Sequence, residues 1–201
     1  MLGSILLFLC ALPMYLQAAK VDLVLGPEQR AMKEPFGVDF DSEGNWYVVE
    51  HKGEVILRVD AKTRSATVYA GTGEVGNAGD GGPAAQARMF DPHGIVITRD
   101  NAWMYVADTR NHTVRRIHRK TGIITTIAGT GQEGYSGDGG PATQATFRGT
   151  FGIALSPDDR ALYIADLGNK RVRQVDLRTG IVTTVAGNGE PGVPRDRKSV
   201  V

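Results

Sequence analysis

The chain has 201 residues, which is enough for one domain and short for two. Its 23 Lys and Arg residues nearly balance 22 Asp and Glu residues, so no strong field favours nucleic acid or a membrane surface as a partner. A single cysteine excludes a disulfide framework and a Cys-rich zinc site. The 26 glycines are almost twice the usual share of about 7%, which indicates many tight turns.

The first 19 residues carry no charged side chain and include an apolar stretch at residues 5–16. That stretch is shorter than the ~20 residues of a membrane span, and small residues follow it before Lys20. Residues 1–19 therefore predict a signal peptide, which implies an exported protein, extracellular or periplasmic, with no stable membrane span. A buried first helix is the alternative.

A unit of 58 residues repeats along the rest of the chain. Tyr47, Tyr105 and Tyr163 are 58 residues apart, and the string GDGGPA at residues 79–84 returns unchanged at residues 137–142. Such self-similarity is typical of a repeat architecture, in which each unit buries its faces only against its neighbours.

The sequence of each repeat predicts four short strands. In the second repeat we expect strands at residues 94–98, 103–107, 113–118 and 123–128, because these segments are rich in β-branched and aromatic residues and turn residues separate them. Four-stranded units at a fixed period predict an all-β fold, a β-propeller.

Two segments then carry a family resemblance. Residues 105–115 (YVADTRNHTVR) and 163–173 (YIADLGNKRVR) resemble NHL repeats, and the Ala-Gly-x-Gly linkers with GDGGPA resemble those of exported bacterial members. The resemblance implies a six-bladed propeller, of which about three four-stranded blades are present. The first repeat departs from the pattern, with Glu50-His51-Lys52-Gly53 in place of Asp-x-x-Asn.

The resemblance also divides the chain. Residues 20–34 align with an outermost strand and are expected to close the last blade of the ring. The three NHL blades follow at residues 35–91, 92–149 and 150–195, the third with an incomplete linker. Residues 196–201 (DRKSVV) resemble a translated sequencing adapter, so we expect that they are not natural and that later blades are lost.

Six polar residues are candidates for ligand contacts. In an up-and-down blade, the loop between the second and third strands and the linker to the next blade open on the same side. The side chains expected to gather on that rim are Asp80, Asp108, Asn111, Asp138, Asp166 and Asn169. They suit a hard cation or a polar ligand; the alternative is a structural turn, in which Asp bonds its own backbone.

His93 lies at the start of an innermost strand, where it is a candidate channel residue. Its position resembles that of a zinc-binding histidine in amidating lyases, although the equivalent positions hold Phe36 and Phe151, so a three-His site from these blades is absent. A packed side chain is the alternative. The other histidines, His51, His112 and His118, show no ligand spacing.

Basic residues along the third strands, including Arg115 and Arg173, alternate with Val and Ile. We interpret them as a solvated stripe, and no nucleic acid is expected as a partner. No Gly-x-Ser-x-Gly nucleophile motif occurs.

The leading hypothesis is an exported, non-catalytic binding or scaffolding module without a cofactor. Its partner would be a protein, a glycan or a small polar ligand. The alternative is a metal-dependent propeller enzyme, a lactone hydrolase or lyase of the gluconolactonase or amidating-lyase type, with Ca²⁺ or Zn²⁺ in the channel. In that alternative, Glu34 and Asp39 are candidate calcium ligands.

Overall fold

A computed structural model describes residues 32–191, which fold as three antiparallel sheets of four strands each. Blade 1 contains β1 (Pro35–Phe40), β2 (Trp46–Glu50), β3 (Val55–Val59) and β4 (Ala66–Ala70). Blade 2 contains β5 (Pro92–Ile97), β6 (Trp103–Asp108), β7 (Thr113–His118) and β8 (Ile123–Ala128). Blade 3 contains β9 (Thr150–Leu155), β10 (Ala161–Asp166), β11 (Arg171–Asp176) and β12 (Val182–Ala186). The predicted all-β fold of four-stranded blades is confirmed.

Several predicted segments lie wholly or partly outside the described residues. They are the signal peptide at 1–19, most of segment 20–34, the end of the third linker and the tail at 196–201. In the part of the chain that is described, short 3₁₀ turns are the only helices: η1 (Ala84–Gln86), η2 (Thr109–Asn111), η3 (Ala142–Gln144) and η4 (Leu167–Asn169). None of them is long and apolar enough to cross a membrane.

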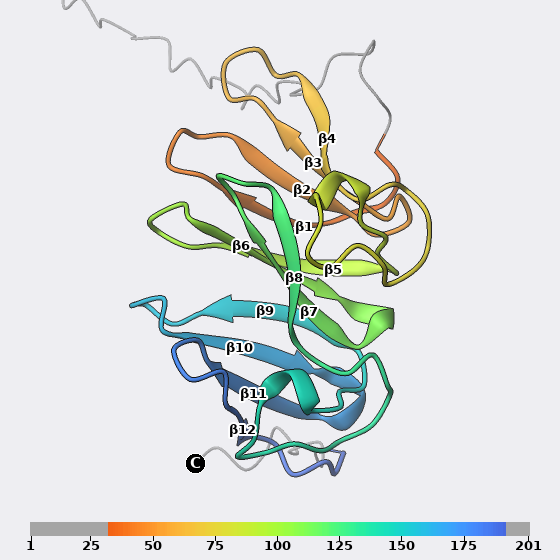
Figure 1. The fold of residues 1–201 in the computed structure, drawn as a ribbon, viewed down its shortest axis with the longest axis vertical. Coiled ribbons are helices and arrows are strands. Elements are labelled where there is room, and N and C mark those ends of the chain that lie inside the picture. Colours follow the sequence, from red (N-terminus) through yellow and green to blue (C-terminus); the bar gives the residue numbers. More distant parts are fainter. Residues whose placement is uncertain (1–31, 192–201) are drawn as a thin grey trace, which may run out of the picture.

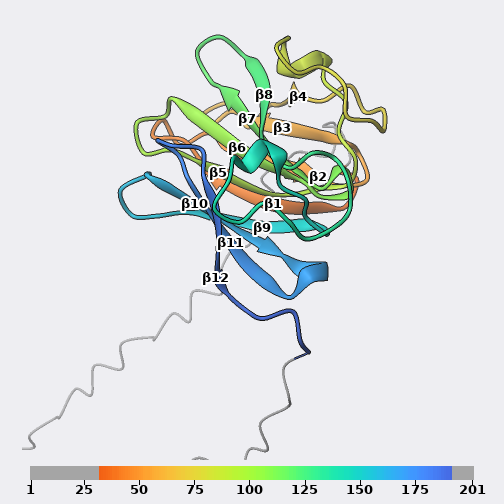
Figure 2. The ribbon, with the colours of Figure 1, turned by 60° about the horizontal axis from the view of Figure 1, so that its bottom comes forward.

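The three blades stack as successive layers, with the first strand of each blade on the inside (Figure 1). Strand β5 contacts both β1 and β9, so the three inner strands lie side by side. In Figure 2 they lie near the centre, with β8 above and β12 below. Two glycines permit this approach, because a Cβ on Gly37 would overlap the His93 carbonyl oxygen and one on Gly94 would lie 2.8 Å from that of Phe151.

The linkers between blades hold the stack together. In linker 1 (residues 71–91) the GDGGPA string pairs with β8, since Gly81 donates to the Ile124 carbonyl at 2.8 Å and Ile124 donates back to Gly82 at 3.0 Å. Linker 2 (residues 129–149) repeats both bonds with Val182 of blade 3. The repeated string therefore adds backbone pairing to the outer edge of the next blade.

Each linker also inserts one large side chain between two blades. Met89 and Phe147 are fully buried there. Met89 belongs to the core between blades 1 and 2, and Phe147 to the core between blades 2 and 3. Burial of such side chains is the main force that joins one blade to the next.

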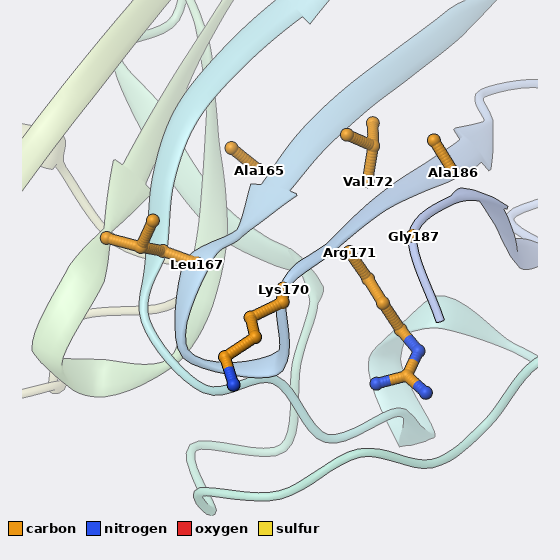
Figure 3. A pocket seen from close by; sticks show the side chains of 7 residues that line it. All are labelled: Ala165, Leu167, Lys170, Arg171, Val172, Ala186 and Gly187. Carbon is orange, nitrogen blue, oxygen red and sulfur yellow. The ribbon is translucent and has the colours of Figure 1, made fainter. Parts of the chain in front are cut away.

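On blade 3 the corresponding position is an open pocket of about 390 Å³, which we call the blade-3 seat (Figure 3). Its lining is Ala165, Leu167, Lys170, Arg171, Val172, Ala186 and Gly187. Val172 and Ala186 correspond in the repeat to Val114 and Ala128, which share a core with Phe147. The seat is therefore an apolar surface of the kind that a further blade covers in a propeller.

Candidate functional site

Asp108 and Asn111, two of the predicted rim residues, hold the turn between β6 and β7. The buried Asp108 carboxylate accepts the Phe90 N–H at 2.8 Å and the Asn111 side-chain N–H at 2.8 Å. Asn111 also donates to the Gly76 carbonyl at 2.7 Å, which ties the turn to linker 1. Burial raises the pKa of Asp108 to about 6, although hydrogen bonds from Phe90 and Asn111 act to lower it.

Blade 3 repeats this arrangement. Asp166, which is fully buried, accepts the Arg148 N–H at 2.8 Å and the Asn169 side-chain N–H at 2.9 Å. Asn169 donates to the Gly134 carbonyl at 2.7 Å. In both blades these Asp and Asn side chains bond the protein itself, in positions that connect a turn to the preceding linker.

The remaining two rim candidates, Asp80 and Asp138, pair with buried arginines. Arg115 lies 2.6 Å from Asp80 and 3.5 Å from Asp108. Arg173 lies 2.8 Å from Asp138 and 3.5 Å from Asp166. The structure thus brings Asp80 together with Asp108, and Asp138 together with Asp166, through an arginine in each blade.

The interpretation of these arginines as a solvated stripe is wrong, because Arg115 is 1% exposed and Arg173 is fully buried. Alternation along the third strand predicted which residues share a face. It did not show that a bulge at Val114 and Arg115, opposite the end of β8, accompanies Arg115, or that Asp80 of the linker pairs with its guanidinium. A buried guanidinium between two carboxylates satisfies charges that would otherwise be costly to bury.

The first repeat differs, and its difference creates a cluster. In place of the Asp-x-x-Asn turn, His51 reaches towards blade 2, where its Nδ1 lies 2.7 Å from Asp91 Oδ1. Its Nε2 lies 2.7 Å from Glu34 Oε2. Because both ring nitrogens face carboxylates, His51 is held in one orientation at the inner ends of blades 1 and 2.

His93 lies at the start of β5, the predicted position, and is 5% exposed. Its ring lies beside that of His51, with the centroids 5.0 Å apart. Its Nδ1 donates to the Asp91 carbonyl at 2.7 Å, and the Thr109 hydroxyl lies 3.0 Å away. The rings of Phe36 and Phe151 pack against it, with centroids 4.4 and 4.0 Å away. Burial lowers the pKa of His93, so its ring is neutral at neutral pH.

Next to His93 is a pocket of about 300 Å³ between blades 2 and 3, which we call the His93 pocket. It is lined by Asp91, His93, Thr109, Arg110, His112, Glu133, Arg148, Gly149 and Phe151. Arg110 pairs with Asp91 at 3.1 Å, and Arg148 pairs with Glu133 at 2.6 Å. His112 Nδ1 accepts the Gly149 N–H at 3.0 Å, so its Nε2 carries the proton.

Donor atoms of His51, Asp91 and His93 lie within 4.8 Å of one another, a spacing that can hold a metal ion. A three-His site does not fit, because Phe36 and Phe151 occupy the other two positions and pack on His93. The two candidate calcium ligands, Glu34 and Asp39, have different hydrogen-bond partners. Asp39 accepts the Ile97 N–H at 2.7 Å, and the Glu34 carboxylate hydrogen-bonds His51 Nε2.

Sequence reasoning missed His51, Asp91, Arg110, His112 and Arg148. The available signal was disagreement between repeats. The position of His51 is Thr109 in the second repeat and Leu167 in the third, and the position of His93 is Phe151 in the third. A position where one repeat differs from the others does not have the structural role that the repeats share. Here two such positions, those of His51 and His93, lie side by side in the structure.

The sequence of the chain is similar to those of several known proteins. No protein-family model matches the chain. NHL repeat-containing protein 2 of Bos taurus is 28% identical over 170 residues, which cover 78% of this chain and 23% of the relative. Teneurin-1 of Gallus gallus is 39% identical over 83 residues, which cover 35% of this chain and 3% of the relative. The chain therefore spans about a quarter of the length of NHL repeat-containing protein 2.

Solved structures share the fold. A protein of unknown function from Bacteroides thetaiotaomicron aligns with a TM-score of 0.64 at 18% identity, over 79% of this chain and 40% of that one. An auxiliary nutrient binding protein from Bacteroides ovatus aligns with a TM-score of 0.57 at 24% identity, over 74% of this chain and 37% of that one. At these identities the likeness is one of fold alone.

Proposed function

Because the chain consists of NHL-repeat β-propeller blades, we propose that it is an exported ligand-binding module and that a saccharide binds in the His93 pocket. The observation that carries the proposal is a pocket at the inner end of the blades whose charged groups are already paired with each other. The predicted signal peptide at residues 1–19 supports export.

The charges of the pocket favour a neutral ligand. Arg110 is paired with Asp91, and Arg148 with Glu133, so two cations balance two anions. A charged ligand would have to break one of these pairs, whereas hydroxyl groups can add hydrogen bonds to the unused donors and acceptors of all four side chains.

The remaining lining suits a sugar ring. Phe151 offers an apolar face, Thr109 a hydroxyl, and His112 the N–H on its Nε2. Small-molecule pockets combine apolar and aromatic walls with a few placed polar groups, and about 300 Å³ is the lower end of their usual volume. A monosaccharide unit, apolar on one face and hydroxylated at its edge, matches that combination.

An NMR titration with a panel of neutral mono- and disaccharides tests the proposal. We expect at least one sugar to shift the amide signals of His93, Thr109 and Phe151, and Phe151→Ala to abolish those shifts. Tyr135→Ala is the matched control, because Tyr135 is a partly exposed aromatic residue outside the pocket. The proposal fails if no sugar shifts these signals or if Phe151→Ala binds equally well.

A metal-dependent lactone hydrolase or lyase is the second candidate, favoured by the metal-binding spacing of His51, Asp91 and His93 beside the pocket. Incubation with a sugar lactone in the presence of Zn²⁺ or Ca²⁺ distinguishes it. Turnover that disappears in His93→Gln supports an enzyme, and binding of the sugar without turnover of its lactone supports the binding module.

A further inference from the structure

We propose that His51, Asp91 and His93 form a binding site for a divalent transition-metal ion such as Zn²⁺, with one carboxylate and two imidazole ligands. The site joins blade 1 to blade 2, because His51 follows β2 and the other two residues come from the end of linker 1 and the start of β5. Metal binding at this site does not require that a saccharide binds in the His93 pocket.

The tautomer of His93 suits a metal ligand. The Thr109 hydroxyl donates its proton to the Thr150 carbonyl at 2.7 Å, so towards His93 it can only accept. The Asp91 carbonyl, 2.7 Å from the same nitrogen, is also an acceptor. The proton of His93 is therefore on Nδ1, and Nε2 keeps its lone pair. Metal-binding histidines commonly donate their other N–H to a backbone carbonyl in this way.

His51 has a carboxylate on each side. Glu34 holds the Nε2 end at 2.7 Å, while the Nδ1 end faces Asp91 Oδ1 at the same distance. A metal ion between His51 and Asp91 would replace the proton that these two groups share. Glu34 would then complete a carboxylate–histidine–metal arrangement, which fixes the ring and raises its basicity.

Asp91 is fixed by its backbone as well as by its carboxylate. Its N–H donates to Glu54 Oε2 at 2.6 Å, and its carbonyl accepts the His93 proton. Lys52 also approaches Asp91 Oδ1, at 3.4 Å, but its side chain is 53% exposed and can swing into solvent at little cost. Arg110 contacts the other carboxylate oxygen, at 3.1 Å, and can stay there.

The spacing needs an adjustment. Tetrahedral zinc bonds of about 2.0–2.2 Å place two ligands about 3.4 Å apart. Pairs of the cluster, which lie within 4.8 Å, therefore close by up to about 1.4 Å, and His51 Nδ1 and Asp91 Oδ1, now 2.7 Å apart, open. A shift of the His51 side chain contributes to that movement, and Glu34, whose side chain is 66% exposed, can follow it and keep its contact with Nε2. Two nitrogens and one oxygen select a transition metal over Ca²⁺, which prefers six to eight oxygen ligands.

Isothermal titration of the purified, tag-free chain with ZnCl₂, and separately with CaCl₂, tests the site. We expect one Zn²⁺ per chain and no Ca²⁺ at this site. His93→Gln and His51→Gln should each weaken Zn²⁺ binding at least about 10-fold. His118→Gln is the matched control, because His118 lies in β7, away from the cluster, and its side chain contacts Thr121 and Trp103.

Circular dichroism of each variant distinguishes the loss of a metal ligand from the loss of the fold. If His93→Gln does not fold, the Zn²⁺ affinity of His51→Gln alone decides the result. Co²⁺ provides a second readout, since its d–d absorption reports nitrogen and oxygen ligands at low coordination number. The proposal is overturned if the unaltered chain binds no Zn²⁺, or if His51→Gln binds it as tightly as the control. Performing the saccharide titration in EDTA keeps that result independent of this one.

Discussion

His51 Nδ1 and Asp91 Oδ1 lie 2.7 Å apart, although 40 residues separate the two in sequence. The contact crosses from the end of β2 to the entrance of β5. In the second repeat the equivalent of His51 is Thr109, which instead supports His93 and the Thr150 carbonyl. The same turn therefore has different roles in two repeats. In the second repeat it supports His93, and in the first it places His51 at the junction of blades 1 and 2.

Glu34→Gln tests the role of Glu34 as a positioning residue for the metal site. Glu34 is 66% exposed and contacts His51 Nε2, so we expect the fold to be unchanged and Zn²⁺ affinity to fall about 10- to 100-fold. Isothermal titration measures this change, with the exposed Glu190→Gln as control. Unaltered affinity would show that Glu34 does not orient the ligand.

Phe147→Ala tests the insertion of linker side chains between blades. Phe147 is fully buried, and removal of a buried aromatic ring costs about 3–5 kcal/mol of unfolding free energy. Phe147→Met is the control, because Met89 fills the equivalent position in linker 1 and the two side chains are similar in volume. Urea denaturation gives both values; equal losses in the two variants would contradict the packing account.

Asp166→Ala tests the arginine pairs. It leaves Arg173, which is fully buried, with Asp138 as its remaining carboxylate, and removing one partner of a buried ion pair costs about 3–5 kcal/mol. Asp138→Ala should cost less, because the Asp138 side chain is 38% exposed. Chemical denaturation measures the free energy of unfolding of both variants. A larger decrease for Asp138→Ala than for Asp166→Ala would contradict the view that Asp166 is the more important partner of Arg173.

The carboxyl of Asp108 should titrate near neutral pH. Burial raises its pKa in the folded protein to about 6, against about 3.9 in an unfolded chain, despite Arg115 at 3.5 Å and hydrogen bonds from Phe90 and Asn111. The folded state then holds an extra proton between pH 4 and 6. The contribution of Asp108 to the free energy of unfolding therefore falls as the pH rises through that window.

Carbon-13 NMR of the Asp108 side chain measures this titration directly. A midpoint close to 6 is expected. Asp108→Asn provides the matched comparison, because it should remove the decline in stability between pH 4 and 6 that this group causes. A midpoint below 4 would mean that the neighbouring donors outweigh burial.

The blade-3 seat should cause self-association. Leu167, 58% exposed, lies at its edge, and its floor of Val172 and Ala186 is apolar. We expect sedimentation velocity to detect multimers at micromolar concentrations, and Leu167→Lys to reduce them, while Gln144→Lys, an exposed control on η3, should not. A monodisperse, cooperatively melting monomer would contradict this expectation.

Much of the fold could be predicted from the sequence, because a repeat of fixed length constrains every copy at once. The expected strands at residues 103–107, 113–118 and 123–128 agree with β6, β7 and β8 within one residue. Strand β5 starts at Pro92, two residues before the expected start, because Pro92 already pairs with Asp108 across the bulge in that ladder.

The candidate site was less predictable, since it depends on contacts between blades. His51 and His93 show no ligand spacing within a strand, yet the stacking of β1 on β5 brings their ring centroids to 5.0 Å. Period and pattern show which residues share a face of one blade. They do not give the side-chain direction at a turn, which here depends on Glu34 and Asp91 as partners.

Crystals of the chain grown with Zn²⁺, with diffraction data collected on either side of the zinc absorption edge, test the central claim most directly. We predict one anomalous peak bonded to His51, Asp91 and His93, with Glu34 still on the far nitrogen of His51. A peak bound only by other side chains, or no peak near His93, would contradict the account.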